Sequence, residues 1–244
     1  MIAGYERHSP SKLNLFCAQP SMFVLQYVLG VAQPVGVPAH RGVAVEDGVT
    51  HGLIHPDAHF DDCNHVAVSK YDALTALSGD PRREKYRETV ISMVHTALQQ
   101  LRRYGVPSAT QEVVTWQPYG LALPILGYLD YRWDQHGIVA DLKTTERIPT
   151  EIKIPHARQV SLYAVSDNTH AHLIYVSPKK LEAYVLENIR AHRDALANVA
   201  KRVENFLSLS DDPEYYLGIT VPDLESFYWA NPEARELAFR YWGV

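Results

Sequence analysis

The chain has 244 residues, of which 46% are apolar, and its net charge at neutral pH is -5. This length fits a single domain with a sizeable core, and the two cysteines exclude a disulfide framework and a four-cysteine iron–sulfur cluster. No apolar run is long enough for a transmembrane helix, and the first residues lack the apolar segment of a signal peptide, so we expect a cytoplasmic protein that does not contact a membrane.

Charge is unevenly distributed along the chain. Residues 211–244 contain seven acidic residues and two arginines, whereas residues 80–104 contain six Arg or Lys and three acidic residues. The net charge argues against indiscriminate nucleic-acid binding, but an acidic C-terminal region on a neutral body leaves room for a local basic groove.

Helical signals fill the first hundred residues. Ser9 followed by Pro10 predicts a capped helix start. Further helices are predicted over residues 41–54, 58–77 and 82–104, with a loop at 33–40.

The pattern then changes to strands. A strand is predicted over residues 111–117, a hairpin over 123–144, a helix over 154–165, a strand over 171–176, and helices over 179–207 and 232–241. This order predicts an α/β fold, a mixed sheet flanked by helices. We expect one domain, 1–244, with a helical N-terminal region at 1–105, a sheet core at 106–177 and C-terminal helices at 178–244.

The hairpin carries the most informative residues. With a turn over Gln135 and His136, Asp130 faces Asp141 across the two strands, and Lys143 points to the same face. Directly opposed like charges are destabilising, which indicates a cation between the two carboxylates. The same alternation is also typical of the solvated face of an edge hairpin.

Three other segments bear on the hairpin. His156, Gln159 and Tyr163 share one helical face, as site residues or as ordinary half-buried ones. Glu46 lies among small apolar residues, where a carboxylate needs a partner: a metal, a salt bridge or solvent. The capped start of the first helix, with Ser11, either binds a phosphate or only closes the helix.

Taken in order, these motifs resemble the PD-(D/E)XK nuclease superfamily, in particular its RecB-like and phage recombination exonuclease branch. The resemblance spans about residues 9–165, and its motifs are SPSKLNLFC (9–17), RGVAVE (41–46), GYLD (127–130), DLKT (141–144) and HARQVSLY (156–163). It implies a restriction-endonuclease-like core with helical additions at both ends.

The resemblance also implies roles for individual residues. Asp130, Asp141, Glu46 and the backbone carbonyl of Leu142 correspond to ligands of Mg²⁺ or Mn²⁺, as two ions. Catalytic residues, in addition to the two aspartates, are implied at Lys143, Gln159 and Tyr163. Residues expected to contact DNA are Ser11, Lys12, His156 and Arg158. The iron–sulfur subclass of the family is excluded by the two cysteines.

We therefore expect a metal-dependent deoxyribonuclease that acts on DNA in phage-type recombination or repair. The closing segment, Phe227 to Trp242, resembles the last helix of phage members of the family, and this segment and the lack of a target-recognition domain favour an exonuclease. The resemblance also implies a single-strand annealing protein as a partner, and an oligomer as one form of assembly. The alternatives are an endonuclease of the same superfamily and a non-catalytic DNA-binding protein on the same fold. A zinc protein is a weaker alternative, based on His51, His55, His59, Cys63 and His65.

Overall fold

The computed structural model describes residues 4–165 and 169–244. Their contacts separate into two compact units, each built from distant segments of the sequence. Unit 1 comprises residues 1–34, 114–127 and 190–244, and unit 2 comprises residues 35–113 and 128–189. The predicted single domain 1–244 stays a prediction. Within the described residues, no helix combines the length and apolar character needed to cross a membrane.

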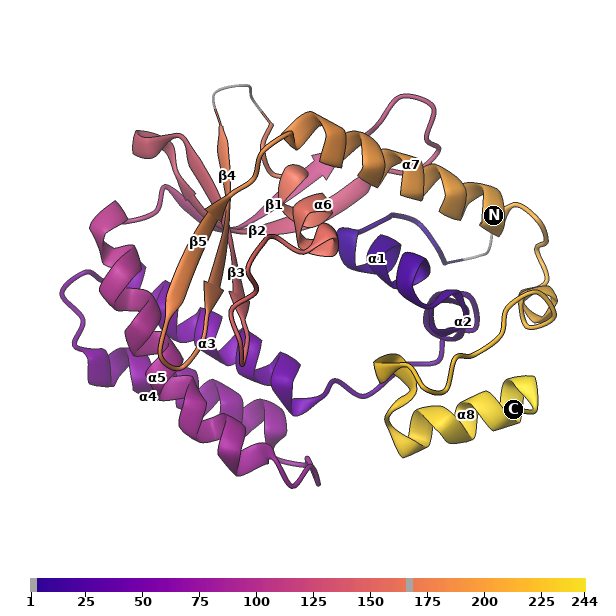
Figure 1. Cartoon of the computed structure of the whole chain (residues 1–244), viewed down its shortest axis with the longest axis horizontal. Helices are drawn as coiled ribbons and strands as arrows, with labels where there is room; N and C mark the ends of the chain where they lie inside the picture. The colour runs from indigo at the N-terminus through magenta and orange to yellow at the C-terminus, as the bar shows by residue number, and fades with distance from the viewer. Residues whose placement is uncertain (1–3, 166–168) are drawn as a thin grey trace. The chain divides into compact units, whose positions relative to one another are not determined.

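Unit 1 is mainly helical (Figure 1). Its helices are α1 (Pro10–Ala18), α2 (Pro20–Phe23), α7 (Ile189–Leu207) and α8 (Pro232–Trp242). The predicted cap of the first helix is confirmed, because Ser9 Oγ accepts a hydrogen bond from the backbone N–H of Lys12 at 3.3 Å. This contact satisfies one of the free amides at the helix start.

A buried carboxylate joins three segments of unit 1. Glu204 on α7 accepts hydrogen bonds from the backbone N–H groups of Ala122 (2.8 Å) and Leu123 (2.9 Å). Its Oε1 also lies 3.3 Å from Nε2 of His8, whose side chain is fully buried. A buried carboxylate is stable only with such partners, so Glu204 fixes the N-terminal segment and residues 122–123 against α7.

Unit 2 contains most of the sheet. The helices are α3 (Val37–Ile54), α4 (Phe60–Thr75), α5 (Arg83–Leu101) and α6 (Ile154–Ser161). The strands are β1 (Ala109–Trp116), β2 (Ile125–Trp133), β3 (Ile138–Thr144), β4 (His170–Val176) and β5 (Leu181–Val185). The unit boundary passes through β1 and β2.

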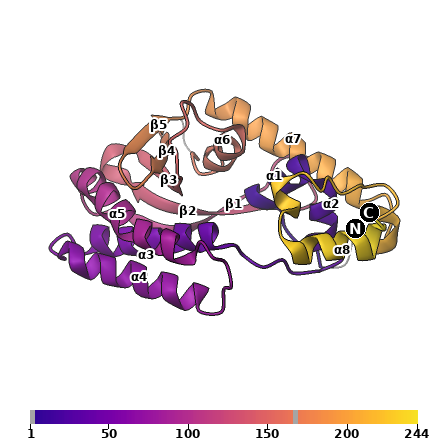
Figure 2. The ribbon, with the colours of Figure 1, turned by 60° about the horizontal axis from the view of Figure 1, so that its bottom comes forward.

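The sheet is five-stranded and mixed, with the order β1-β2-β3-β4-β5. β3 runs parallel to β4, whereas β2 and β5 run antiparallel to their neighbours β3 and β4. In unit 2, α3, α4 and α5 lie on one face of the sheet and α6 lies on the other (Figure 2). The predicted α/β architecture, a mixed sheet flanked by helices, is therefore confirmed.

The apolar face of the hairpin forms part of the core of unit 2. Tyr131, Trp133 and Ala140 are fully buried, and they belong to one cluster with Val94 and Leu98 of α5. Full burial of a side chain such as Val94 or Leu98 contributes about 1.5–3 kcal/mol relative to exposure. This face therefore anchors the hairpin and leaves its other face free for polar residues.

Three predicted element boundaries are wrong. The predicted loop 33–40 already contains the start of α3 at Val37, because Pro38 is accommodated in a first helical turn. The predicted helix 154–165 ends at Ser161. The predicted helix 179–207 is two elements: β5 pairs with β4, and α7 begins only after Asn188, which has a φ of 52°. The region 178–244 is thus not wholly helical.

Candidate active site

The hairpin has the register that its sequence predicts. The ladder pairs Tyr131 with Ala140 and Trp133 with Ile138, and extending this register by one residue would place Asp130 opposite Asp141. The turn is a 3-10 segment from Asp134 to His136, followed by Gly137 in the left-handed region at φ 62°, a conformation that favours glycine.

The two aspartates are buried at this position. Asp141 is fully buried, and Asp130 is 8% exposed. The backbone N–H of Leu142 donates a hydrogen bond of 2.7 Å to Oδ2 of Asp130, which ties the carboxylate of β2 to β3. Burial, and then the charges of Asp141 and Glu46, raise the pKa of Asp130 well above its usual value. The positive charge around the Asp130 carboxyl group is therefore too small to offset its burial and the two neighbouring carboxylates.

Lys143 supplies the nearest positive charge. Its Nζ lies 2.5 Å from Oδ2 of Asp141, although that oxygen accepts no hydrogen bond of regular geometry. Burial opposes the charge of the ammonium, but Asp141, Asp130 and Glu46 outweigh it and raise the pKa of Lys143. Lys143 thus stays protonated beside the aspartates.

Glu46 on α3 belongs to the same cluster. Burial and the charge of Asp141 raise the pKa of Glu46 to about 7, while Lys143 acts in the opposite direction. Tyr131 donates a hydrogen bond of 3.4 Å to the backbone carbonyl of Glu46. The helix that carries the third carboxylate is therefore attached to β2 next to Asp130.

Gln111 is a site residue that the sequence analysis missed. Its side-chain amide donates hydrogen bonds to Glu46 and, at 3.5 Å, to Oδ1 of Asp130. Its φ is 51°, which is unusual for a residue other than glycine. Strained backbone of this kind concentrates at functional sites. The sequence offered no signal beyond its position at the start of the predicted strand 111–117.

α6 adds the predicted supporting residues. Gln159 donates hydrogen bonds to Oδ1 of Asp141 at 3.0 Å and to the hydroxyl of Tyr163 at 3.3 Å. Tyr163 lies beyond the end of the helix and is almost fully buried. The structure therefore joins Gln159 and Tyr163 to Asp141, and their catalytic role stays a prediction.

The residues expected to contact DNA lie in both units. His156 is half-buried on α6, and its Nδ1 lies 2.7 Å from the hydroxyl of Tyr175. Burial, and then Lys143 and Lys153, lower the pKa of His156 to about 4, so the ring is neutral at pH 7. Arg158 is also half-buried on α6.

Ser11 and Lys12 belong to unit 1. Nζ of Lys12 donates a hydrogen bond to the backbone carbonyl of Arg7 at 3.2 Å and lies over the rings of Tyr5 and Tyr27. Burial, and then the charge of Arg7, lower the pKa of Lys12. A role of Ser11 and Lys12 in binding DNA stays a prediction.

Metal-binding capacity depends on the side-chain arrangement. Among residues 4–165 and 169–244, no three His, Cys, Asp or Glu side chains are arranged to hold a metal ion. Two residues of the zinc alternative are held in other contacts. Cys63 is fully buried, and His59 caps α4 and pairs with Asp61. Metal binding by Glu46, Asp130 and Asp141, and by the carbonyl of Leu142, stays a prediction.

Comparisons with known proteins give little similarity. No protein-family model and no curated protein matches the chain. Among solved structures, the crystal structure of SSO0001 is similar with a TM-score of 0.34 and 15% sequence identity, over 77% of this chain and 95% of that chain. A likeness at this level carries no argument about function.

Proposed function

We propose that this protein is a DNA nuclease of the PD-(D/E)XK type that hydrolyses phosphodiester bonds with Mg²⁺ or Mn²⁺. The observation that supports the proposal is the clustering of Glu46, Asp130, Asp141 and Lys143 in one unit, on three different elements. Under this proposal the sheet of unit 2 is a restriction-endonuclease-like core.

The chemistry of the donor set fits a hard divalent cation. Three buried or half-buried carboxylates share one ammonium, and Oδ2 of Asp141 accepts no regular hydrogen bond. Hard cations prefer oxygen ligands and neutralise such charge. Glu46, Asp130 and Asp141 would hold two ions, with the carbonyl of Leu142 as a further ligand. When bound, the metal would lower the pKa of a water molecule and polarise the phosphate.

The chain's own residues would perform the remaining steps. The ammonium of Lys143 would orient the attacking water and offset charge that develops on the phosphate. Gln159, anchored by Tyr163, fixes the rotamer of Asp141, so that the carboxylate faces Lys143. Burial of this cluster strengthens each charge interaction because less water screens it.

The end-processing mode rests on the resemblance. The residue order of the motifs and the closing segment are similar to phage recombination exonucleases, which favours an exonuclease over an endonuclease. A cytoplasmic location, an annealing partner and an oligomer belong to the same proposal.

The test is digestion of end-labelled linear DNA and of circular DNA with Mg²⁺ by the wild type and by Asp141→Asn. Loss of one buried carboxylate should lower the rate on linear DNA by roughly 10³-fold, about 4 kcal/mol of transition-state stabilisation. Asp57→Asn, an exposed acid near the start of α4, is the matched control. Full activity of Asp141→Asn would overturn the site assignment, and cleavage of circles would replace the exonuclease by an endonuclease.

One observation favours a second candidate, a non-catalytic DNA-binding protein on the same fold. In the described portion of the chain the acids are not arranged to hold a metal, and Lys143 pairs with Asp141. A wild type that binds DNA, and degrades neither single- nor double-stranded DNA with Mg²⁺ or Mn²⁺, would support this candidate.

A further inference from the structure

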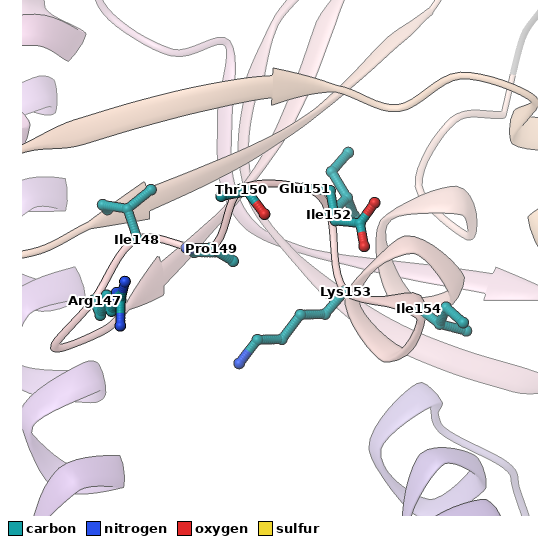
Figure 3. A pocket seen from close by; sticks show the side chains of 8 residues that line it. All are labelled: Arg147, Ile148, Pro149, Thr150, Glu151, Ile152, Lys153 and Ile154. Atoms are coloured by element: carbon teal, nitrogen blue, oxygen red, sulfur yellow. The ribbon is translucent and has the colours of Figure 1, made fainter.

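The loop between β3 and α6 forms a hollow that the proposed active site does not use. The hollow has a volume of about 510 Å³ and is lined by residues Arg147 to Ile154 (Figure 3). Its polar side chains are those of Arg147, Thr150, Glu151 and Lys153. Lys153 extends its ammonium into the open space beside the loop (Figure 3). The walls of the hollow thus combine two cations, one carboxylate and a hydroxyl with isoleucine and proline side chains.

Its two cations have no carboxylate partner among the described residues. Within those residues neither Arg147 nor Lys153 forms an ion pair, whereas the preceding acid, Glu146, is paired with Arg41 at a distance of 2.5 Å. Arg41 is buried and is further held by Thr89 at 3.4 Å. Glu146 is therefore directed to α3, and the charges of Arg147 and Lys153 remain available for an anion.

The hollow lies next to the acidic cluster. Lys143 on β3 is the register partner of Tyr175 on β4, and adjacent strands are about 5 Å apart. The hydroxyl of Tyr175 accepts a hydrogen bond of 3.4 Å from the backbone N–H of Lys153. One buried tyrosine thus connects the C-terminal end of the segment that lines the hollow to the strand position of Lys143.

Hydrogen bonds within the loop and from β5 hold the loop in shape. The hydroxyl of Tyr184 on β5 donates a hydrogen bond of 2.7 Å to the carbonyl of Pro149, and the hydroxyl of Thr145 donates one of 2.8 Å to the carbonyl of Arg147. Thr145 is in turn fixed to the end of β4 by a backbone hydrogen bond to Val176. A preformed site loses less conformational entropy on binding.

We propose that this hollow binds the sugar–phosphate backbone of the substrate strand next to the phosphodiester that is cut. Arg147 and Lys153 contact phosphate oxygens, Thr150 donates a hydrogen bond, and Ile148, Pro149 and Ile152 pack against the sugar. The ligand is a DNA strand, whose repeating phosphates and sugars match the cations and the apolar side chains of the hollow. The inference rests on the proposed nuclease function and assigns its strand-binding site.

The test compares two double variants with the same loss of charge. Arg147→Gln with Lys153→Gln alters the hollow, and Arg202→Gln with Arg240→Gln alters exposed residues of α7 and α8 in unit 1. Binding of a short, end-labelled single strand is measured with Ca²⁺ in place of Mg²⁺ over a range of salt concentrations. Thermal unfolding of each variant checks that the fold is kept.

The hollow variant should bind about tenfold more weakly, and the slope of log K against log salt should decrease by about 1.4, the value for two lost phosphate contacts with a single strand. The control variant in α7 and α8 should match the wild type in both quantities. If the two variants bound the strand equally well and the wild type cleaved DNA, the hollow would not be the strand-binding site, and the proposed nuclease function would be retained. A wild type that neither binds nor cleaves DNA would overturn the proposed function itself. If the hollow variant bound inorganic phosphate more weakly than the wild type but bound the strand equally well, DNA would be rejected as the ligand of the hollow.

Discussion

Gln159 donates a hydrogen bond of 3.0 Å to Oδ1 of Asp141. This contact places an uncharged donor on a fully buried carboxylate whose other oxygen faces Lys143. The orientation of Asp141 therefore depends on α6 as well as on its own strand.

Gln159→Glu should reduce nuclease activity strongly without unfolding the protein. The new carboxylate would repel Asp141 and turn it away from Lys143, and a misplacement of about 1 Å in a catalytic group costs roughly 10²-fold in rate. The measurement is kcat on linear DNA with Mg²⁺. Gln99→Glu on the exposed side of α5 adds the same charge and serves as the control. Equal rates for the two variants would show that the contact has no role in the reaction.

Gln111 should act as a positioning residue for the acids. Gln111→Gly relieves the backbone strain of a φ of 51° but removes the amide that bridges Glu46 and Asp130. We expect unchanged or higher stability, since glycine adopts this conformation readily, together with a higher Mg²⁺ concentration for half-maximal activity. Gln111→Asn, which tolerates the same backbone conformation but is one methylene shorter, should give an intermediate value. A Mg²⁺ dependence like that of the wild type in both variants would contradict this role.

Sequence patterns located the hairpin portion of the site because two local rules determine it. Alternation sends Asp130, Asp141 and Lys143 to one face, and the apolar residues on the other face fix the register. Gln111 could not be found in this way, since its contact with Glu46 arises only when α3 packs beside β1, and its φ has no signature in the residue type. β5 was read as helix because a five-residue edge strand depends on pairing with β4, which no local pattern contains.

Protonation of His156 should destabilise the protein at acidic pH. Its pKa is lowered to about 4 in the folded chain, chiefly by burial, whereas a histidine in an unfolded chain titrates near 6.5. The unfolded state therefore binds more protons between these values, so this contribution to stability is complete above about pH 6.5 and is lost as the pH falls towards 4. His8, whose pKa is lowered mainly by burial, acts in the same direction.

Urea unfolding at pH 7.5, 6.0 and 5.0 measures this dependence. The free energy of unfolding should decrease towards pH 5, and His156→Gln should make the decrease smaller. A direct check is the NMR titration of the His156 ring, in which an apparent pKa at or above 6.5 would contradict the prediction.

Gly48 sets how closely α3 approaches α4, and replacing it should destabilise unit 2. A Cβ atom at this position would lie 2.7 Å from Cβ of Ala67 and 2.8 Å from the backbone carbonyl oxygen of Cys63. Overpacking of this kind costs about 1–3 kcal/mol, which exceeds the gain of about 1 kcal/mol from replacing glycine by alanine within a helix. Gly48→Ala should therefore lower the denaturant midpoint.

Gly79→Ala, where no heavy atom lies within 4 Å of the added carbon, should change stability by less than about 0.5 kcal/mol. Since Glu46 lies two residues before Gly48, a shift of α3 should also displace that carboxylate from Asp130. Equal midpoints for the two variants would mean that α3 moves freely against α4, and the position of Glu46 would then have to be fixed by its contacts with Gln111 and Tyr131.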